Sequence, residues 1–497
     1  MELERRRCTS HSAQPLTLTA GHGPASDHPD PSATGLWRKI FWRLIPILSI
    51  AYLCSYIDRV NLGYVGVPLS KDLGLSAAGM GFAAGIFFLG YTLAEIPGNL
   101  IQYRVGARKW ITCILITWGL ITAATAAVDN PATLYLARAL LGFAEGGLLA
   151  GILLYLTYWM PRSQQSKALS YFFLVIPVSA ITGALLASFL LGHYGLVFGL
   201  AGWRSVFLTE GTLSLLLAVP VWFTLTDKPQ EASWLTSSER EMLHAELDRD
   251  AASAQAVTLT LARAPLRDRH VWALAFAYFA IVFGLSPLAF FLPKMITVVQ
   301  HSLHNNQAVL ITIIPQLIAA AGMIAWARLA RRRTPATATI VPAGVAALAM
   351  AVAAYASNVV IFVSAVCVAI AGIYSAIPQF WRLPPLRLSG PAAAAGLALI
   401  NSVGSSSGFA GSYVTGFAED VTGSFRDALL LVTVIMLLGV LTIAFIGRSA
   451  LRSPAPRADA GTALNGRQPP HSVTAPTVQD TGGSQGDCES RSPDLAR

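Results

Sequence analysis

The chain has 497 residues, of which 54% are hydrophobic and only 12% are charged. Soluble domains carry about 25% charged residues, so this composition excludes a soluble globular protein and indicates an integral membrane protein. The formal net charge of +9 does not indicate nucleic-acid binding, because the sequence shows no basic face with interleaved aromatic residues.

Twelve apolar segments are long enough to cross a bilayer, since a helical span needs about 20 residues. They run over residues 40–67, 77–103, 109–128, 132–160, 167–191, 203–225, 271–298, 306–328, 335–355, 358–381, 392–418 and 427–447. We therefore predict an all-α integral membrane protein with 12 transmembrane helices.

The long gap between spans 6 and 7 divides the chain into six plus six. We predict a first half at 40–225, a central loop at 226–270 and a second half at 271–447. Residues 237–250 of the loop have the pattern of a short amphipathic helix. The polar segments 1–39 and 448–497 are predicted to be disordered tails.

Lysine and arginine are concentrated in alternate loops. With the N-terminus inside, the cytoplasmic loops carry 17 of them, and the external loops carry three, namely Lys71, Arg204 and Arg426. Because basic residues accumulate on the cytoplasmic side, we predict that both tails and the central loop are cytoplasmic, in a cell membrane such as the bacterial inner membrane. The first residues lack an apolar core followed by a cleavage site, so no secretory signal is predicted.

The two halves carry related stretches at corresponding places. Span 2 leads into "RVGARKW" and span 8 into "RLARRRTP", while span 4 ends in "WMP" and span 10 in "FWRLPP". Internal repeats with a binding site near the bilayer midplane are typical of secondary transporters.

Five stretches, in order, carry a family resemblance: "YIDRVNLGYV", "FFLGYTLAEIPGNLIQYRVGARKWI", "LARALLGFAEGGLLAGILLYLTYWMPRSQQSKA", "GWRSVFLTEG" and "GLALINSVGSSSGFAGSYVTGFAEDVTG". From about Arg43 to Gly447 the chain resembles the major facilitator superfamily, in particular its anion:cation symporter family. The resemblance implies two pseudo-symmetric six-helix halves around a central cavity and import of organic anions, usually with protons. One departure is Gln102, where the superfamily's loop signature usually has an aspartate.

Asp58 and Arg59 lie inside predicted span 1, and Arg138 and Glu145 lie inside predicted span 4. Such charges are costly in a membrane and usually mark functional sites. A guanidinium binds a carboxylate with two parallel hydrogen bonds, so we predict that Arg59 and Arg138 bind the substrate. Asp58 and Glu145 are predicted to carry protons. In the alternative, the pairs Asp58–Arg138 or Arg59–Glu145 only tie helices together.

Other residues are candidates for the same site, although ordinary packing explains them as well. They are Tyr91 in the first half and Tyr278, Tyr374, Gln379 and Asn401 in the second. Glu95 is predicted to have a structural role. Lys294 is close enough to the external end of its span to extend its amine into solvent.

We predict a proton-coupled importer of a small organic carboxylate that works by alternating access, as a monomer in the lipid bilayer, without cofactor or metal. Two alternatives are a proton-antiport efflux carrier and a non-transporting nutrient receptor on the same scaffold. A membrane-embedded enzyme is disfavoured, because the sequence has no metal-ligand cluster, nucleophile elbow or glycine-rich phosphate loop.

Overall fold

The computed structural model describes residues 31–173, 175–193, 197, 199–253, 268–386 and 391–452. These residues form α-helices joined by short turns, and no strand occurs among them. The described helices up to Ser449 belong to one compact unit. Most of the two predicted tails lies outside the described residues.

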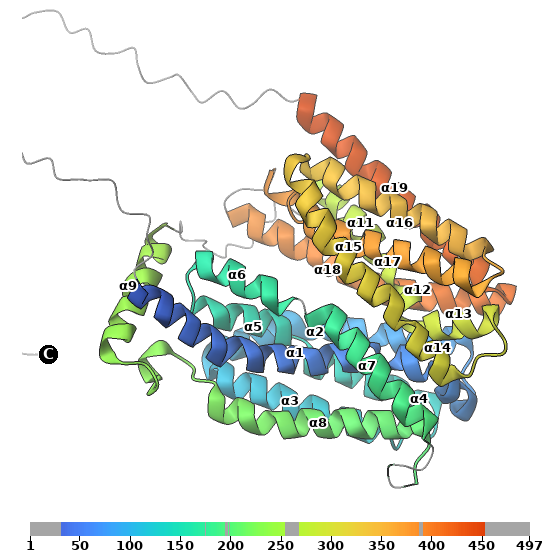
Figure 1. Ribbon diagram of the computed structural model, residues 1–497, viewed down its shortest axis with the longest axis horizontal. Coiled ribbons are helices and arrows are strands. Elements are labelled where there is room, and N and C mark those ends of the chain that lie inside the picture. The colour runs from blue at the N-terminus through green and yellow to red at the C-terminus, as the bar shows by residue number, and fades with distance from the viewer. Residues whose placement is uncertain are drawn as a thin grey trace, which may run out of the picture. The chain divides into compact units, whose positions relative to one another are not determined.

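In the part of the chain that the structure describes, the first half forms helices α1 to α8 (blue to green in Figure 1). They are α1 (Pro31–Leu73), α2 (Ala77–Val105), α3 (Ala107–Thr125), α4 (Pro131–Glu145), α5 (Leu148–Thr157), α6 (Arg162–Phe172), α7 (Val175–Gly192) and α8 (Gly202–Thr224). Helix α9 (Ser237–Ser253) follows in the central loop, so the helix predicted there is confirmed.

The second half (yellow to red in Figure 1) contains the remaining helices. They are α11 (Arg269–Phe283), α12 (Leu285–Phe290), α13 (Leu292–Val299), α14 (Asn305–Ile311), α15 (Ile313–Leu329), α16 (Pro335–Tyr355), α17 (Val359–Phe380), α18 (Pro391–Thr422) and α19 (Phe425–Arg452). Every predicted span therefore corresponds to one helix or to consecutive helices. Among the described residues, ten helical stretches are long and apolar enough to cross a membrane.

The predicted fourth span is broken into α4 and α5 at a pair of glycines. Gly147 has φ of +96°, a left-handed conformation that side chains with a Cβ rarely adopt. The break makes Glu145 the last residue of α4. Span 7 is likewise divided into α11, α12 and α13.

Helix α1 begins within the segment that we predicted to be a disordered tail, and this part of the prediction is wrong. Leu36, Ile40 and Leu44 are spaced by four residues and are buried in one core cluster with residues of the central loop. This spacing places them on one helix face. Lys39 also forms an ion pair with Glu239 at 2.8 Å. These contacts with the central-loop segment stabilise the additional helical turns.

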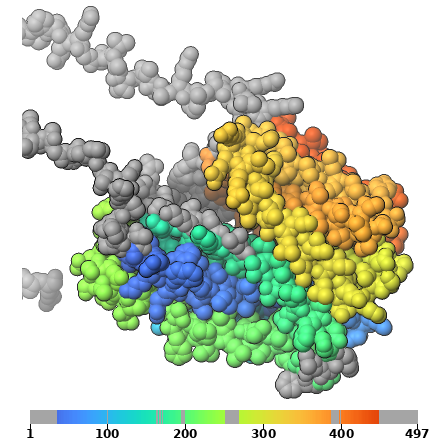
Figure 2. All heavy atoms as spheres, viewed as in Figure 1, coloured from blue at the N-terminus to red at the C-terminus, as the bar shows by residue number. Residues whose placement is uncertain are grey.

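The two halves contact each other through a small set of helices. Helix α2 packs on α18, α7 packs on α14 and α15, and α1 packs on α12 and α13. The Ser188 hydroxyl donates to the Asn306 carbonyl at 2.9 Å, and the Asn305 amide donates to the Tyr64 carbonyl at 3.3 Å. In Figure 2 the side chains of α7 (teal) and of α14 and α15 (yellow) meet directly.

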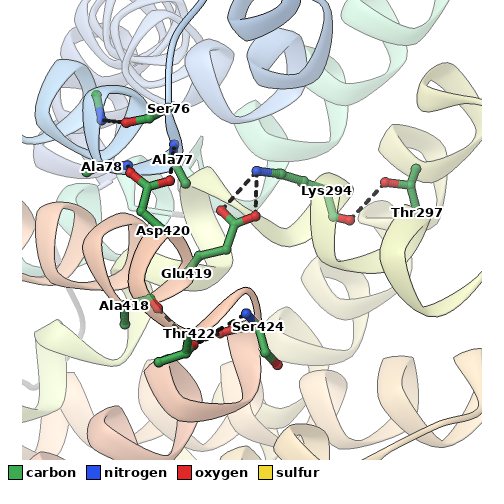
Figure 3. Close-up of polar contacts among 11 residues, drawn as sticks. Ser76, Ala77, Ala78, Lys294, Thr297, Ala418, Glu419, Asp420, Thr422 and Ser424 are labelled. Atoms are coloured by element: carbon green, nitrogen blue, oxygen red, sulfur yellow. Dashed lines mark hydrogen bonds and ion pairs between the residues drawn. The ribbon is translucent and has the colours of Figure 1, made fainter.

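Further polar contacts lie at the end of the bundle opposite α9 (Figure 1), which we call the outer end and predict to be external. Figure 3 shows these contacts. The Asp420 carboxylate, near the end of α18, accepts hydrogen bonds from the backbone N–H groups of Ala77 at 2.9 Å and Ala78 at 2.8 Å. These donors are the first residues of α2, so an acid of the second half caps a helix of the first. Beside it, Lys294 and Glu419 form an ion pair at 2.8 Å. Lys294 therefore has a carboxylate partner, a contact that the sequence did not predict.

At the opposite end, Gln102 stands where the superfamily's loop signature usually has an aspartate. Its side chain is buried, and Nε2 donates to the Gly151 carbonyl at 2.7 Å. The residue therefore ties α2 to α5 as a neutral donor.

Candidate functional site

An ion pair between α1 and α4 forms the centre of the candidate site. Arg59 Nη2 lies 2.5 Å from Glu145 Oε1. The Ser55 hydroxyl, one turn earlier in α1, donates to the same oxygen at 2.5 Å. Glu145 is fully buried, and its Oε2 has no hydrogen-bond partner among the described residues. Of the two ion pairs considered from the sequence, the structure therefore forms Arg59–Glu145.

Aromatic rings surround the Arg59 guanidinium. Its Cζ lies 4.7 Å from the ring centroid of Tyr91, 5.5 Å from that of Phe87 and 5.7 Å from that of Tyr56. Separations below about 6 Å give favourable cation–π contacts. The Arg59 side chain is 15% exposed, whereas Glu145 is 0% exposed. Arg59 thus lies at the edge of the buried cluster, and the structure places the predicted Tyr91 beside it.

Arg138 lies deeper than Arg59. Its side chain is fully buried, its Nε donates to the Ala83 carbonyl at 3.4 Å, and its Cζ lies 5.0 Å from the centroid of Phe87. The two Nη groups have no hydrogen-bond partner among the described residues. The Phe87 ring therefore contacts both guanidinium groups. In this conformation Arg138 does not reach a solvent-exposed surface.

Asp58 and its neighbour Arg59 have different hydrogen-bond partners. It is buried and accepts hydrogen bonds from Trp118 Nε1 and Thr122 Oγ1 of α3, and from Asn61 Nδ2 at 2.7 Å. Consecutive residues point about 100° apart around a helix. Asp58 and Arg59 therefore belong to two separate clusters. The first surrounds the Arg59–Glu145 ion pair, and the second surrounds Asp58 and Asn61.

Glu210 in α8 is a buried acid of the second cluster that sequence reasoning missed. The same Asn61 Nδ2 donates to Glu210 Oε2 at 2.6 Å, and Glu210 is 4% exposed. The signal was present, because Glu210 lies inside predicted span 6, in the stretch "FLTEG". The high cost of a charge inside a membrane, from which Asp58, Arg59, Arg138 and Glu145 were predicted to be functional, applies to Glu210 as well.

Two further predicted residues lie close to the Arg59 pair. Tyr374 in α17 lines a small cavity of about 50 Å³ between the halves, together with Tyr56 of α1. A cavity of this size holds a few water molecules but not an organic acid. Glu95, for which we predicted a structural role, lies one turn beyond Tyr91 in α2 and within electrostatic range of Arg59.

The other second-half candidates have local partners. Tyr278 stacks on Phe380 with a centroid separation of 4.9 Å. Gln379 Oε1 accepts a hydrogen bond from Arg382 Nη1 at 2.7 Å. Asn401 is partly buried in α18. In the part of the chain that the structure describes, no hydrogen bond, ion pair or ring contact joins Tyr278, Gln379 or Asn401 to either arginine, so their role in binding stays a prediction.

Comparisons with known proteins agree with this architecture. Residues 48–412 match the family model described as Major Facilitator Superfamily. A protein of Agrobacterium vitis named "Putative tartrate transporter" is 37% identical over 414 residues, which cover 83% of this chain and 91% of that protein. A protein of Acinetobacter baumannii named "Quinolone resistance transporter" is 34% identical over 405 residues, covering 81% and 93%.

The fold is also found in solved structures. The crystal structure of a bacterial homologue of the human lysosomal transporter Spinster superposes with a TM-score of 0.69 and 18% sequence identity. The match covers 84% of this chain and 99% of that one.

Proposed function

This chain belongs to the major facilitator superfamily and is a multi-pass membrane transporter, and we propose that it imports a small organic carboxylate together with protons. Relatives whose names refer to tartrate transport support a carboxylate substrate. The observation that carries the proposal is the partly exposed Arg59, whose ion partner is the buried Glu145.

The surroundings of Arg59 suit a carboxylate. Its buried Nε has no hydrogen-bond partner among the described residues, so one donor of the planar guanidinium remains unused and can serve a second anion. The rings of Tyr56, Phe87 and Tyr91 exclude water from the same side chain. A charge-assisted hydrogen bond is stronger in such a dry environment than in water.

We assign the proton to Glu145, because Glu145 and the substrate carboxylate share Arg59. A proton from solvent that binds the Glu145 carboxylate removes its negative charge and leaves Arg59 free to attract the anion. Conversely, an anion bound to Arg59 takes the counter-charge away from Glu145 and favours proton uptake there. The two effects are equal by linkage. On release both the proton and the anion leave, and no covalent bond of the substrate changes.

Arg138 is a proposed second ligand of the anion. Its two Nη groups lack hydrogen-bond partners among the described residues, so their N–H donors remain available for a carboxylate. Because Arg138 is fully buried here, contact with the substrate requires a movement of the Phe87 ring during the change between conformations. From the second half, Tyr374 is the proposed contributor, since it lines the cavity beside Tyr56.

Uptake of labelled tartrate into proteoliposomes tests the proposal. The wild-type protein is expected to accumulate the label under an inward proton gradient, whereas Glu145→Gln exchanges label across the membrane but does not accumulate it. Glu241→Gln, at an exposed position of α9, is the matched control and should behave as wild type. Absence of saturable uptake for tartrate and for a panel of other organic acids would overturn the carboxylate assignment and favour the non-transporting receptor.

Efflux by proton antiport is a second candidate function, because a relative is named for quinolone resistance. Quinolones carry a carboxylate, so Arg59 suits them as well, and the direction of transport decides between the two functions. Everted membrane vesicles that accumulate a quinolone on energisation, while right-side-out vesicles fail to accumulate tartrate, would establish efflux.

A further inference from the structure

A second set of buried acids lies on the side of α1 that faces α3 and α8. Asn61 Nδ2 donates one hydrogen bond to Asp58 Oδ1 at 2.7 Å and another to Glu210 Oε2 at 2.6 Å. A primary amide has two N–H donors, so the nitrogen of Asn61 is fully used. The two carboxylates are thereby held on either side of one amide group.

In the described part of the first half, the buried acids around α1 outnumber the two arginines beside them, of which Arg138 is buried and Arg59 is partly exposed. The acids are Asp58, Glu145 and Glu210, and the bases are Arg59 and Arg138. Each of these acids is at most 4% exposed. A buried carboxylate without a counter-charge is strongly unfavourable. With one proton on one acid, two negative and two positive charges remain and the set is neutral.

Among the described residues, the base within electrostatic range of Glu210 is Arg138, which is already counted. The helices that pack against α8 are α1, α3 and α7. Helix α7 has no charged residue in its sequence, and α3 contributes Trp118 and Thr122 as hydrogen-bond donors to Asp58. The other titratable or charged groups within electrostatic range of Glu210 are Asp58, Arg138, Tyr64 and Cys54.

The hydrogen bonds decide which acid holds the proton. Asp58 accepts three of them, from Trp118, Thr122 and Asn61, and several donors stabilise the ionised form of a carboxylate. Glu210 accepts one from Asn61, and its Oε1 has no donor among the described residues although it is buried. Asp58 is therefore the ionised member of the pair and Glu210 the neutral one.

We propose that Glu210 is a second proton-binding residue of the transporter, separate from Glu145, and that it is protonated in this conformation. An O–H bond forms on Glu210 with a proton taken from solvent, and Asp58 remains charged, within electrostatic range of Arg138. The place of this proton in transport rests on the proposed symport, but its presence on Glu210 does not. The carrier then has two acids that bind protons. Glu145 lies beside Arg59 at the proposed anion site, and Glu210 lies in α8, bonded to Asn61.

Infrared spectroscopy of the purified protein without substrate tests the proposal. At neutral pH we expect a carbonyl band of a protonated carboxyl group that shifts in D₂O. The band should move to lower frequency when glutamate, but not aspartate, carries a ¹³C carboxyl label. It should be lost in Glu210→Gln and retained in Glu241→Gln, which alters an exposed glutamate of α9 and is the matched control.

Three results would overturn the assignment: absence of the band, a shift with labelled aspartate, or persistence of the band in Glu210→Gln. Glutamine has the shape of a protonated glutamate, so Glu210→Gln is expected to keep the wild-type melting temperature, and a variant that unfolds would contradict a neutral Glu210. Because no substrate is used, this result is independent of whether Glu145 couples uptake to the proton gradient.

Discussion

Arg59 in α1 and Glu145 at the end of α4 form a buried ion pair with an Nη2–Oε1 distance of 2.5 Å. Glu145 is the last residue of α4 because the helix breaks at Gly147. Arg59 is partly exposed because it lies at the edge of the buried cluster around Glu145. In the proposed function, the pair joins the residue assigned to the substrate to the residue assigned to the proton.

Replacing Arg59 by lysine should weaken substrate binding although the charge is kept. A lysine is a point charge without the planar fork that binds a carboxylate through two hydrogen bonds. Loss of one charge-assisted hydrogen bond, about 1.5–3 kcal/mol, corresponds to roughly a 10- to 100-fold weaker Kd. Calorimetric titration of the purified variant with tartrate measures this. Arg426→Lys, at an exposed position, is the control, and equal affinities of both variants would count against Arg59 as a ligand.

Removing the Asp420 carboxylate should loosen the outer end. Asp420→Ala leaves the N–H groups of Ala77 and Ala78 without their acceptor. Loss of a helix cap costs about 0.5–2 kcal/mol, which changes the ratio of closed to open forms by about 2- to 30-fold. Distances between spin labels at Lys71 and Arg426 should shift to longer values. Asp427→Ala, which removes an exposed acid nearby, should leave the distance distribution unchanged. An unchanged distribution in Asp420→Ala would show that the Asp420 contact does not hold the outer ends of the two halves together.

The same contact makes the closed outer end sensitive to acid. Asp420 lies beyond the predicted span. Burial by itself raises the pKa of its carboxyl group, but the hydrogen bonds from Ala78, Ser76 and Ala77 and the charge of Lys294 together outweigh burial, and the pKa lies below its ordinary value. A lowered pKa means that the stabilisation is complete above the ordinary pKa and is lost as the pH falls through the lowered value. The label distances should lengthen over that acidic range in wild type and be independent of pH there in Asp420→Ala.

Gly142 is expected to be essential for the contact between α4 and α2. A Cβ at this position would meet the backbone carbonyl of Phe87, and overpacking costs about 1–3 kcal/mol. Gly142→Ala should therefore lower the melting temperature in detergent. Gly344→Ala in α16 is the matched control, because a Cβ there meets no atom within 4 Å, and alanine favours a helix over glycine. If the Gly142→Ala protein were as stable as this control, α4 could move away from α2 without loss of stability, and the prediction would be wrong.

The predicted orientation can be tested with single cysteines in a cysteine-free background. Asp129→Cys, in an exposed position before α4, should react with a membrane-impermeant thiol reagent added to intact cells, whereas Asp248→Cys in α9 should react only after lysis. The basis is the concentration of basic residues in the loops on the side of α9. Labelling of Asp248→Cys in intact cells would invert the topology.

The sequence by itself determined where the membrane helices lie and which residues were worth examining. A long apolar segment has few alternatives to a helix, because the bilayer leaves no partner for free backbone groups. The same cost makes each charge in a span conspicuous, which is why Asp58, Arg59, Arg138 and Glu145 could be named without a structure. The resemblance of the motifs to a transporter family added the expected pairing of the two halves.

Only the tertiary structure decided which partner each of these residues has. Glu145 binds Arg59, Asp58 turns away to Trp118 and Thr122, and Arg138 is covered beside Phe87. A helix that packs on protein on one side and on lipid on the other is apolar all round, so its periodicity does not reveal the inner face. Since neighbouring residues point about 100° apart, the rotation of each helix against its neighbours sets the partners. That rotation depends on packing between segments far apart in the sequence, such as the contact that brings Glu210 of α8 to Asn61 of α1.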